Sequence, residues 1–465
     1  MAPSKSGELL ARVNFPLYSL NVLTERHILV TGGGGKSRTG IPNKIEIYEL
    51  VPTDKTCKAE PVTRHLTGDC AIMNSTVFFH KSKRDFALAA GHDEHCQLYR
   101  MRYCLLEDSN DDDKDTPDAR SDRERRGSSS TVRRRRKSDS VSSTSGGAER
   151  SEGEKPQKVE NGVPNGLTTE PETAKRDSNA NSVRIGFSLQ PETSFQTDFS
   201  PKEEPFQKVV RFAPEAELLF TGGADGCLRA WKYPQFKMEY EVKAHSDELD
   251  DLCISPTEST VVTVSRDGHG YVWELKDGKK VCELVFAAPG RSTEKYLFRA
   301  CRFGIVEGDR SNHRLFTISN AAVRKKPPSP CYLVKWDTRK FVPEKVQATG
   351  PDMLSSLAVS EDGRFVGVGH LSGAVEVYIA FSLQRLYRAE HAHNIFVTGL
   401  EFLKSCDETR RLAGNYDASL ISISVDNHIV AHHIPFPATM GMMGLFAMFV
   451  GVLLMIYLLM DFLGL

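Results

Sequence analysis

The side chains and backbone with the clearest potential for chemistry lie in a glycine-rich stretch between Thr31 and Lys44. A phosphate-binding loop needs Gly, four residues, then Gly-Lys-Ser/Thr, because its N–H groups and lysine hold the phosphates. Gly35-Lys36-Ser37 supplies the end of this pattern, but Val30 occupies the position of the first glycine. Residues 40 and 42 are glycine and proline, which disfavour the helix that must follow. A phosphate loop is therefore the least favoured interpretation.

Two other interpretations of this stretch stay open from the residues alone. The plain one is a flexible hairpin connection, since segments 27–30 and 44–50 on either side read as strands. The other is a shaped loop whose backbone, free of Cβ atoms, approaches another molecule or an ion. The choice between them depends on the rest of the chain.

Other clusters of reactive side chains are better explained as structure. Gly91–Cys96 holds two histidines, two carboxylates and a cysteine, but its spacing is that of a turn between two strands. His245 and His393 have no metal-ligand partner at suitable spacing, and we expect them to tie strands or turns together. We find no Ser-His-Asp pattern and no paired carboxylates, which argues against covalent catalysis.

Composition indicates a cytosolic domain without a strong overall field. The 465 residues carry a formal net charge of −1, so net charge gives no support for nucleic-acid binding. The ten cysteines form no CxxC pair, which fits reduced thiols better than disulfides or a zinc site. The first ten residues are polar, so we expect no signal peptide and a cytosolic location for residues 1–437.

The C-terminal region is uncharged from Ala438 to Met460, a run of 23 residues. As a helix it would be about 34 Å long, enough to cross a bilayer. The sequence therefore predicts a transmembrane helix at 438–460 and a short lumenal tail at 461–465. Three glycines dilute the apolarity of the run, which suits a thinner membrane such as the endoplasmic reticulum.

Residues 107–191 differ in composition from everything around them. They contain an acidic run, Asp108–Asp113, a basic run, Arg133–Lys137, and many serines, glycines and asparagines. Apolar residues are too sparse to offset the entropy of ordering, so we predict a disordered insertion. The basic run fits a nuclear signal, a nucleic-acid patch, an acidic-lipid contact, or simply a solvated charge run.

Short strands recur at regular intervals in the remaining sequence. The turns around Asp225 and Asp267 are 42 residues apart, which is the pitch of a propeller blade. The third strand of several units ends in a bulky residue: Trp231, Trp273, Trp336 and Tyr378. We predict an all-β fold, a seven-bladed WD-repeat-like β-propeller. Residues 1–106 should form blades one and two, residues 192–434 blades three to seven, and the insertion should leave the rim between blades two and three.

Several segments in combination resemble one family, the prolactin regulatory element-binding protein and its relatives. These relatives are exchange factors of the endoplasmic reticulum membrane for the Sar-type small GTPase that starts COPII coat assembly. The resemblance covers almost everything except the insertion and rests on Phe15–Tyr18, Gly32–Gly35, Gly40–Asn43, Ala89–Asp93, Gln196–Phe199, Gln207–Val210, Ala300–Gly304 and Tyr378–Gln384.

The resemblance implies that residues 31–44 form an exchange loop that reaches the switch regions of the GTPase. Its exchange residues would be Ile41, Pro42 and Asn43, and of these we expect Ile41 and Asn43 to contact the GTPase. The GTPase-binding positions would further include Gly32, Gly33, Gly34, Gly35, Gly40 and, on the same face, His393. The resemblance also implies that backbone carbonyls of the Gly32–Gly40 loop hold a potassium ion, which fixes the loop's shape.

Under this prediction the protein is a guanine-nucleotide exchange factor that breaks no covalent bond. Its partners would be the Sar-type GTPase, the endoplasmic reticulum membrane and, indirectly, COPII coat components. A nuclear DNA-binding regulator is one alternative, with only the basic run at 133–137 in its favour. A passive, membrane-tethered propeller scaffold is the other, because most propellers only bind partners.

Overall fold

The structure is a computed structural model. It describes residues 7–37, 40–53, 57–80, 83–106, 184–201, 204–290, 294–306, 308–437 and 442–463. Within these ranges the strands form seven four-stranded sheets, which confirms the predicted seven-bladed all-β propeller.

The first three blades follow chain order, each with its first strand innermost. Blade one contains β2 (Leu17–Val22), β3 (His27–Gly32), β4 (Lys44–Pro52) and β5 (Cys57–Leu66). Blade two contains β6 (Ser75–His80), β7 (Asp85–His92), β8 (His95–Leu106) and β9 (Arg184–Gln196). Blade three contains β10 (Gln207–Ala213), β11 (Leu218–Gly223), β12 (Cys227–Lys232) and β13 (Lys237–Lys243).

The remaining blades repeat this arrangement, except that the last one borrows a strand. Blade four contains β14 (Leu249–Ile254), β15 (Thr260–Ser265), β16 (Gly270–Glu274) and β17 (Lys280–Glu283). Blade five contains β18 (Tyr296–Val306), β19 (Asp309–Ala321), β20 (Cys331–Asp337) and β21 (Val342–Gly350). Blade six contains β22 (Leu354–Val359), β23 (Phe365–His370), β24 (Val375–Ile379) and β25 (Arg385–Ala389). Blade seven contains β26 (Val397–Phe402), the short helix α1 (Asp407–Leu412), β27 (Ala418–Ser424), β28 (His428–Ile434) and β1 (Glu8–Arg12).

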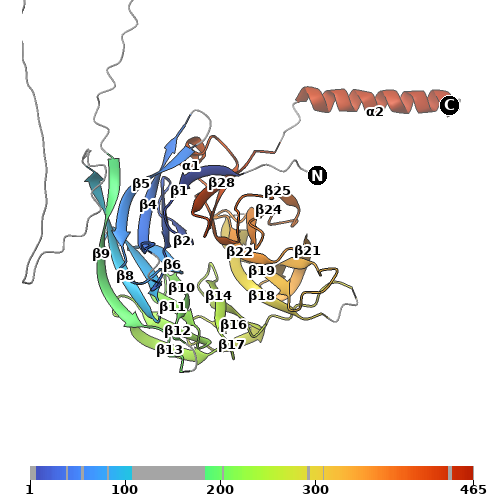
Figure 1. The fold of residues 1–465 in the computed structure, drawn as a ribbon. Coiled ribbons are helices and arrows are strands. Elements are labelled where there is room, and N and C mark those ends of the chain that lie inside the picture. The colour runs from blue at the N-terminus through green and yellow to red at the C-terminus, as the bar shows by residue number, and fades with distance from the viewer. Residues whose placement is uncertain are drawn as a thin grey trace, which may run out of the picture. The chain divides into compact units, whose positions relative to one another are not determined.

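The blades close into a ring through their innermost strands. The contacts run from β2 to β6, β10, β14, β18, β22 and β26, and β26 returns to β2 (Figure 1). The second strands are almost wholly buried; β3, β11 and β23 carry no exposed residue. Apolar side chains of neighbouring blades share the core clusters, so that each blade is stabilised by packing against the next.

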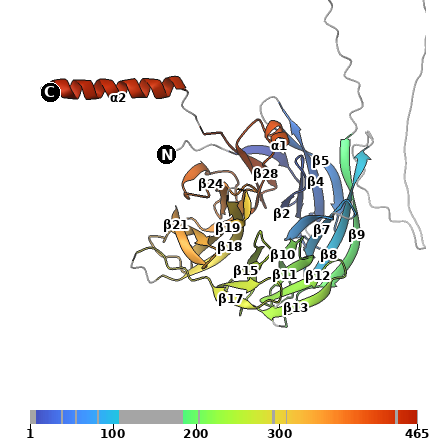
Figure 2. The same ribbon diagram turned by 180° about the vertical axis from the view of Figure 1, so that it is seen from behind.

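The ring is completed by the N-terminal strand, which the sequence did not reveal. β1 pairs antiparallel with β28, with Glu8 opposite Ala431 and Arg12 opposite His428. β1 and β28 lie beside each other in Figure 1, and Figure 2 shows β28 from the opposite side. The pairing ties the start of the chain to its last blade, where β1 is the outermost strand.

The structure differs from the predicted insertion at its end, residue 191, and in its place among the blades. β9 begins at Arg184, so residues 184–191 belong to a strand, and β9 is the fourth strand of blade two. The insertion therefore leaves from within blade two, between β8 and β9, rather than between blades two and three. The start of β9 alternates, with Ile185, Phe187 and Leu189 at every second position, but a polar run at 190–194 follows in this edge strand and resembles the insertion in composition. Residues 107–183, including the basic run, lie outside the described residues.

A second helix, α2 (Met442–Leu463), follows the propeller in the sequence. No helix in the described ranges combines the length and apolarity needed to cross a bilayer, so the transmembrane helix predicted at 438–460 is not supported. α2 continues through Asp461 to Leu463, past the predicted end of the span at Met460.

Candidate functional site in the glycine loop

The glycine-rich stretch connects the second and third strands of blade one. β3 and β4 pair antiparallel up to Gly32 opposite Lys44, and residues 33–43 form the loop beyond that pair. The first glycines of the loop pack closely against the chain segment that precedes β2. The N–H of Gly33 donates to the carbonyl of Pro16 at 3.0 Å, and a Cβ on Gly32 would lie 1.8 Å from the same oxygen. Glycine is therefore required at 32 by contact.

Three glycines of the loop adopt backbone angles that other residues avoid. φ is +140° at Gly33, +67° at Gly35 and +76° at Gly40. A Cβ on Gly33 would also meet the side-chain oxygen of Asn43 at 2.2 Å, whereas Cβ atoms on Gly35 and Gly40 would meet nothing within 4 Å. Gly33 is thus constrained by space and conformation, and the other two by conformation alone. In its described part the loop is constrained at these glycines, which favours the shaped-loop interpretation over the flexible hairpin.

The side chain of Asn43 holds the described part of the loop in place through hydrogen bonds. Its side-chain oxygen accepts from the N–H of Gly35 at 2.8 Å. Its amide nitrogen donates to the carbonyls of Gly68 at 2.9 Å and Gly35 at 3.3 Å, while the N–H of Thr67 donates to the Asn43 carbonyl. The residue is only 5% exposed. These bonds join the loop to the connection between blades one and two.

Ile41 has the opposite character. It is 39% exposed although it is a large apolar residue, and it stands two positions before the buried Asn43. Pro42 lies between them, partly buried, and its carbonyl faces Gly33. The predicted trio thus divides into an outward apolar residue, a stiff spacer and an inward clamp.

Lys36 ties the loop to the neighbouring blade. Its ammonium lies 3.0 Å from a carboxylate oxygen of Asp93, in the turn between β7 and β8. The thiol of Cys70 donates to the same oxygen at 3.2 Å. Hydrogen bonding to Asp93, with its negative charge, raises the pKa of Lys36. Burial, then the bond to Asp93, raises the pKa of Cys70 to about 11, so this thiol stays protonated.

His393 is part of a buried hydrogen-bond chain in the closing blades. Its Nδ1–H donates to Asp426 at 3.1 Å, and its Nε2 pairs with the hydroxyl of Ser422 at 2.8 Å. Ser422 in turn bonds to Nε2 of His432 at 2.8 Å. The described contacts of His393 lie in blades six and seven and do not reach the glycine loop.

The same arrangement occurs in blade four with a tryptophan at its end. His245 bonds to Asp267 at 3.1 Å and to Thr263 at 2.8 Å, and Trp273 donates to Thr263 at 2.8 Å. This confirms the structural role expected for His245 and indicates the same role for His393, with His432 in the position of the tryptophan.

The described residues hold no group of three or more His, Cys, Asp or Glu side chains placed to bind a metal ion. The turn at 91–96 is a strand connection, as expected. Around Gly33 the packing is tight: the position that a Cβ would take lies 2.2 Å from Asn43 Oδ1, 2.5 Å from Asn43 Cα and 2.8 Å from Pro42 O, so this point offers no room for an ion. The potassium ion that the family resemblance implies at backbone carbonyls of the Gly32–Gly40 loop stays a prediction.

Sequence reasoning missed the supports of the loop. Asp93, Gly68 and the Pro16 carbonyl each come from a different connection, and no local pattern links them to residues 31–44. Two signals were available: Phe15–Tyr18 and Ala89–Asp93 are among the segments of family resemblance, and Asp93 lies in a turn at the same relative place in the next blade.

Seven blades around a closed ring, with a shaped loop between two strands of the first, define a WD-repeat β-propeller. Residues 236–274 match the model of the WD domain, G-beta repeat; this segment holds the complete His245–Thr263–Trp273 network. The chain is 33% identical over 460 residues to "Guanine nucleotide-exchange factor SEC12" of Mus musculus, covering 98% of each chain.

The protein of the same name in Rattus norvegicus is 34% identical over 458 residues, again covering 98% of each chain. "SEC12-like protein 2" of Arabidopsis thaliana is 28% identical over 199 residues, 42% of this chain and 46% of that protein. The chain belongs to the SEC12 family, which confirms the resemblance drawn from the sequence.

Proposed function

We propose that the protein is a guanine-nucleotide exchange factor for a small GTPase of the Sar type, acting at the endoplasmic reticulum membrane to start COPII coat assembly. One observation carries this proposal: Asn43 bonds to Gly35 in the described part of the glycine loop and to Gly68 outside it, and Ile41 is exposed beside it. Family membership over nearly the whole chain supports the exchange activity. The segments that resemble the Sar-type exchange factors support the choice of GTPase and location.

The loop's role would be to bind the nucleotide-free GTPase better than the GDP-bound one. A factor with that preference lowers the barrier to GDP release and breaks no covalent bond. Ile41 is the contact residue, because it alone of the trio combines apolar surface with exposure. Asn43 acts through the loop as a positioning residue, since its amide is already used by Gly35 and Gly68.

A potassium ion bound by carbonyls of the Gly32–Gly40 loop would serve the same purpose. Carbonyl oxygens that point toward one another repel, and a monovalent cation offsets that repulsion. Asn43 and Gly33 would keep the oxygens together in the absence of the ion.

The decisive experiment measures release of a fluorescent GDP analogue from a purified Sar-type GTPase, with the full-length protein added. Ile41→Ser should lower the release rate at a given concentration. Val342→Ser is the matched control, because Val342 is an exposed valine of blade five, in β21. Equal rates for the two variants would reject the loop as the exchange element. No acceleration by the unmodified protein would leave the passive scaffold as the better explanation.

The same assay tests the finer parts of the proposal. A panel of other small GTPases should respond less than the Sar type, and replacing potassium by sodium should slow release if the ion shapes the loop. A DNA-binding role would instead need salt-sensitive, sequence-specific binding by the full-length chain. Its sole support, the basic run at 133–137, lies outside the described residues.

A further inference from the structure

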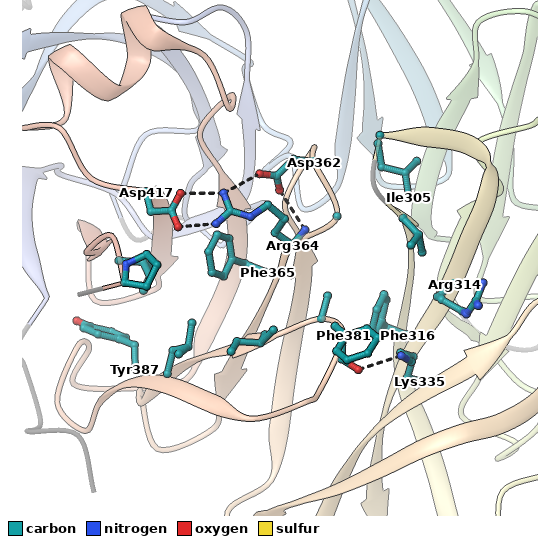
Figure 3. A pocket seen from close by; sticks show the side chains of 18 of the residues that line it. Ile305, Arg314, Phe316, Lys335, Asp362, Arg364, Phe365, Phe381, Tyr387 and Asp417 are labelled. Atoms are coloured by element: carbon teal, nitrogen blue, oxygen red, sulfur yellow. Dashed lines mark hydrogen bonds and ion pairs between the residues drawn. The ribbon is translucent and has the colours of Figure 1, made fainter. Parts of the chain in front are cut away.

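A large hollow opens on the opposite face of the propeller from the glycine loop. It has a volume of about 870 Å³ and is lined by blades five, six and seven (Figure 3). Its walls are the turns that join first to second and third to fourth strands, such as Asp362–Arg364 and Ala380–Phe381. The glycine loop joins a second to a third strand, so it lies at the other ends of the strands. A molecule in the hollow would leave the glycine loop free.

The lining of the hollow is mainly apolar, and two aromatic rings protrude at its edge. Phe316, Phe365 and Ile434 are among the buried lining residues. Phe381 is 83% exposed and Phe436 is 48% exposed. The ammonium of Lys335 donates to the Phe381 carbonyl at 3.0 Å and lies 5.3 Å from its ring centre, which holds that turn in place. An exposed, anchored aromatic beside an apolar hollow is typical of a contact surface.

Charged side chains lie on two opposite sides of the hollow, and the two sides differ in net charge. On the blade-five side, Arg314 and Lys335 share the single carboxylate of Glu344, at 2.7 and 3.0 Å, which leaves one positive charge in excess. On the other side, Arg364 lies between Asp417, at 2.6 Å, and Asp362, at 3.7 Å, which leaves one negative charge in excess (Figure 3).

We propose that this face is a two-fold interface between two copies of the protein, in which Phe381 of each copy enters the hollow of the other. When two copies pack face to face about a two-fold axis, the same surface of each copy contacts the other. The protruding ring of each copy can then fill the hollow of its partner. The same rotation brings the positive side of one copy to the negative side of the other. Because every cation of the hollow already has a carboxylate partner, a charged small ligand would have to break ion pairs, whereas an uncharged phenylalanine ring would not.

Photo-cross-linking of the full-length protein tests the interface directly. A benzoyl-phenylalanine at position 381, in copies labelled with nitrogen-15, is mixed with unlabelled protein of natural sequence and irradiated. We expect cross-links between the labelled peptide that contains residue 381 and unlabelled peptides that contain Phe365 or Ile434. The same photoreactive residue at Val285, which is 71% exposed on a different connection, should give none of these. Cross-links confined to labelled chains alone, or to peptides outside the hollow, would overturn the proposal.

The affinity measurement is independent of the cross-link. Phe381→Ser should raise the dimer dissociation constant by about 30-fold or more, the usual effect of losing one buried aromatic anchor. Val285→Ser should leave it unchanged, and both variants should keep the melting temperature of the unmodified protein within about 2 °C because both side chains are exposed. An unchanged dissociation constant for Phe381→Ser, or a monomer at all accessible concentrations, would reject the interface.

Discussion

Replacing Asn43 by alanine should abolish the shape of the glycine loop without unfolding the propeller. The side chain makes two well-formed hydrogen bonds, with Gly35 N at 2.8 Å and Gly68 O at 2.9 Å, and a longer one with Gly35 O at 3.3 Å. At about 0.5–1.5 kcal/mol net for each good bond, the change costs about 1–3 kcal/mol of preference for the observed loop. That lowers the equilibrium constant for the observed loop by about 5- to 150-fold, and GDP release should slow by up to the same factor.

Two measurements separate a positioning role of Asn43 from a direct contact with the GTPase. In the free protein, hydrogen exchange at the Gly35 amide should become faster in Asn43→Ala, because its acceptor is gone. Asn320→Ala is the matched control, since Asn320 is also 5% exposed and bridges both the N–H and the carbonyl of Leu354. It should cost similar stability and leave GDP release unchanged. Slow release in Asn43→Ala with unaltered amide exchange in the free protein would refute the positioning argument.

Three further predictions concern the loop and its surroundings. Gly33→Ala should slow GDP release more than Gly40→Ala. Both substitutions bring about 1–2 kcal/mol of backbone strain, but only a Cβ at position 33 also displaces the Asn43 oxygen; equal rates for the two variants in the exchange assay would contradict this. Lys36→Met and Asp93→Asn should each slow GDP release by up to about 5-fold at low salt. Neither should have an effect at high salt, because salt screens an ion pair that solvent reaches. A loss of rate that does not depend on salt would count against an electrostatic contact between the loop and blade two. Burial lowers the pKa of His432 to about 3. Below about pH 6.5 this histidine binds a proton in the unfolded chain but stays neutral in the folded chain, so acid favours unfolding. This residue alone should lower the free energy of unfolding by about 2 kcal/mol between pH 7 and pH 5. Urea midpoints at both pH values should fall less steeply for His432→Gln, and an unchanged pH dependence would show that other groups control it.

Much of the architecture could be predicted because propeller blades repeat. The Asp225 and Asp267 turns fall at equivalent places in blades three and four, and Trp231, Trp273, Trp336 and Tyr378 all lie at or near the ends of third strands. The repeat of blades could not predict a strand that is separated in the sequence from the other strands of its blade. β1 is five residues long and pairs with a strand at the far end of the chain. β9 is separated from β8 by the insertion, so its polar edge residues read as part of that insertion.

The candidate site shows a different limit. The family resemblance pointed to residues 31–44 as an exchange loop, and in the structure this stretch has glycines constrained by contact and an exposed Ile41. The exchange role itself stays a prediction. The resemblance did not distinguish Ile41 from Asn43, because both residues stand in the same short motif. Their difference depends on Gly68 and Gly35, whose backbone groups reach the Asn43 amide only after blades one and two have packed.

The supports of the loop also explain why Gly35-Lys36-Ser37 is no phosphate-binding loop. In such a loop the backbone N–H groups must be free to donate to phosphate oxygens, and the lysine must be free to pair with them. Here the N–H of Gly33 is used by Pro16, the N–H of Gly35 by Asn43, and the ammonium of Lys36 by Asp93. In the described part of this loop no helix begins after Ser37. These donors hold the loop instead, and Ile41 is the large apolar residue that the described part of the loop exposes, beside the polar Lys36 and Ser37. These contacts argue against direct nucleotide binding by Gly35-Lys36-Ser37 and favour action on a nucleotide that a second protein holds.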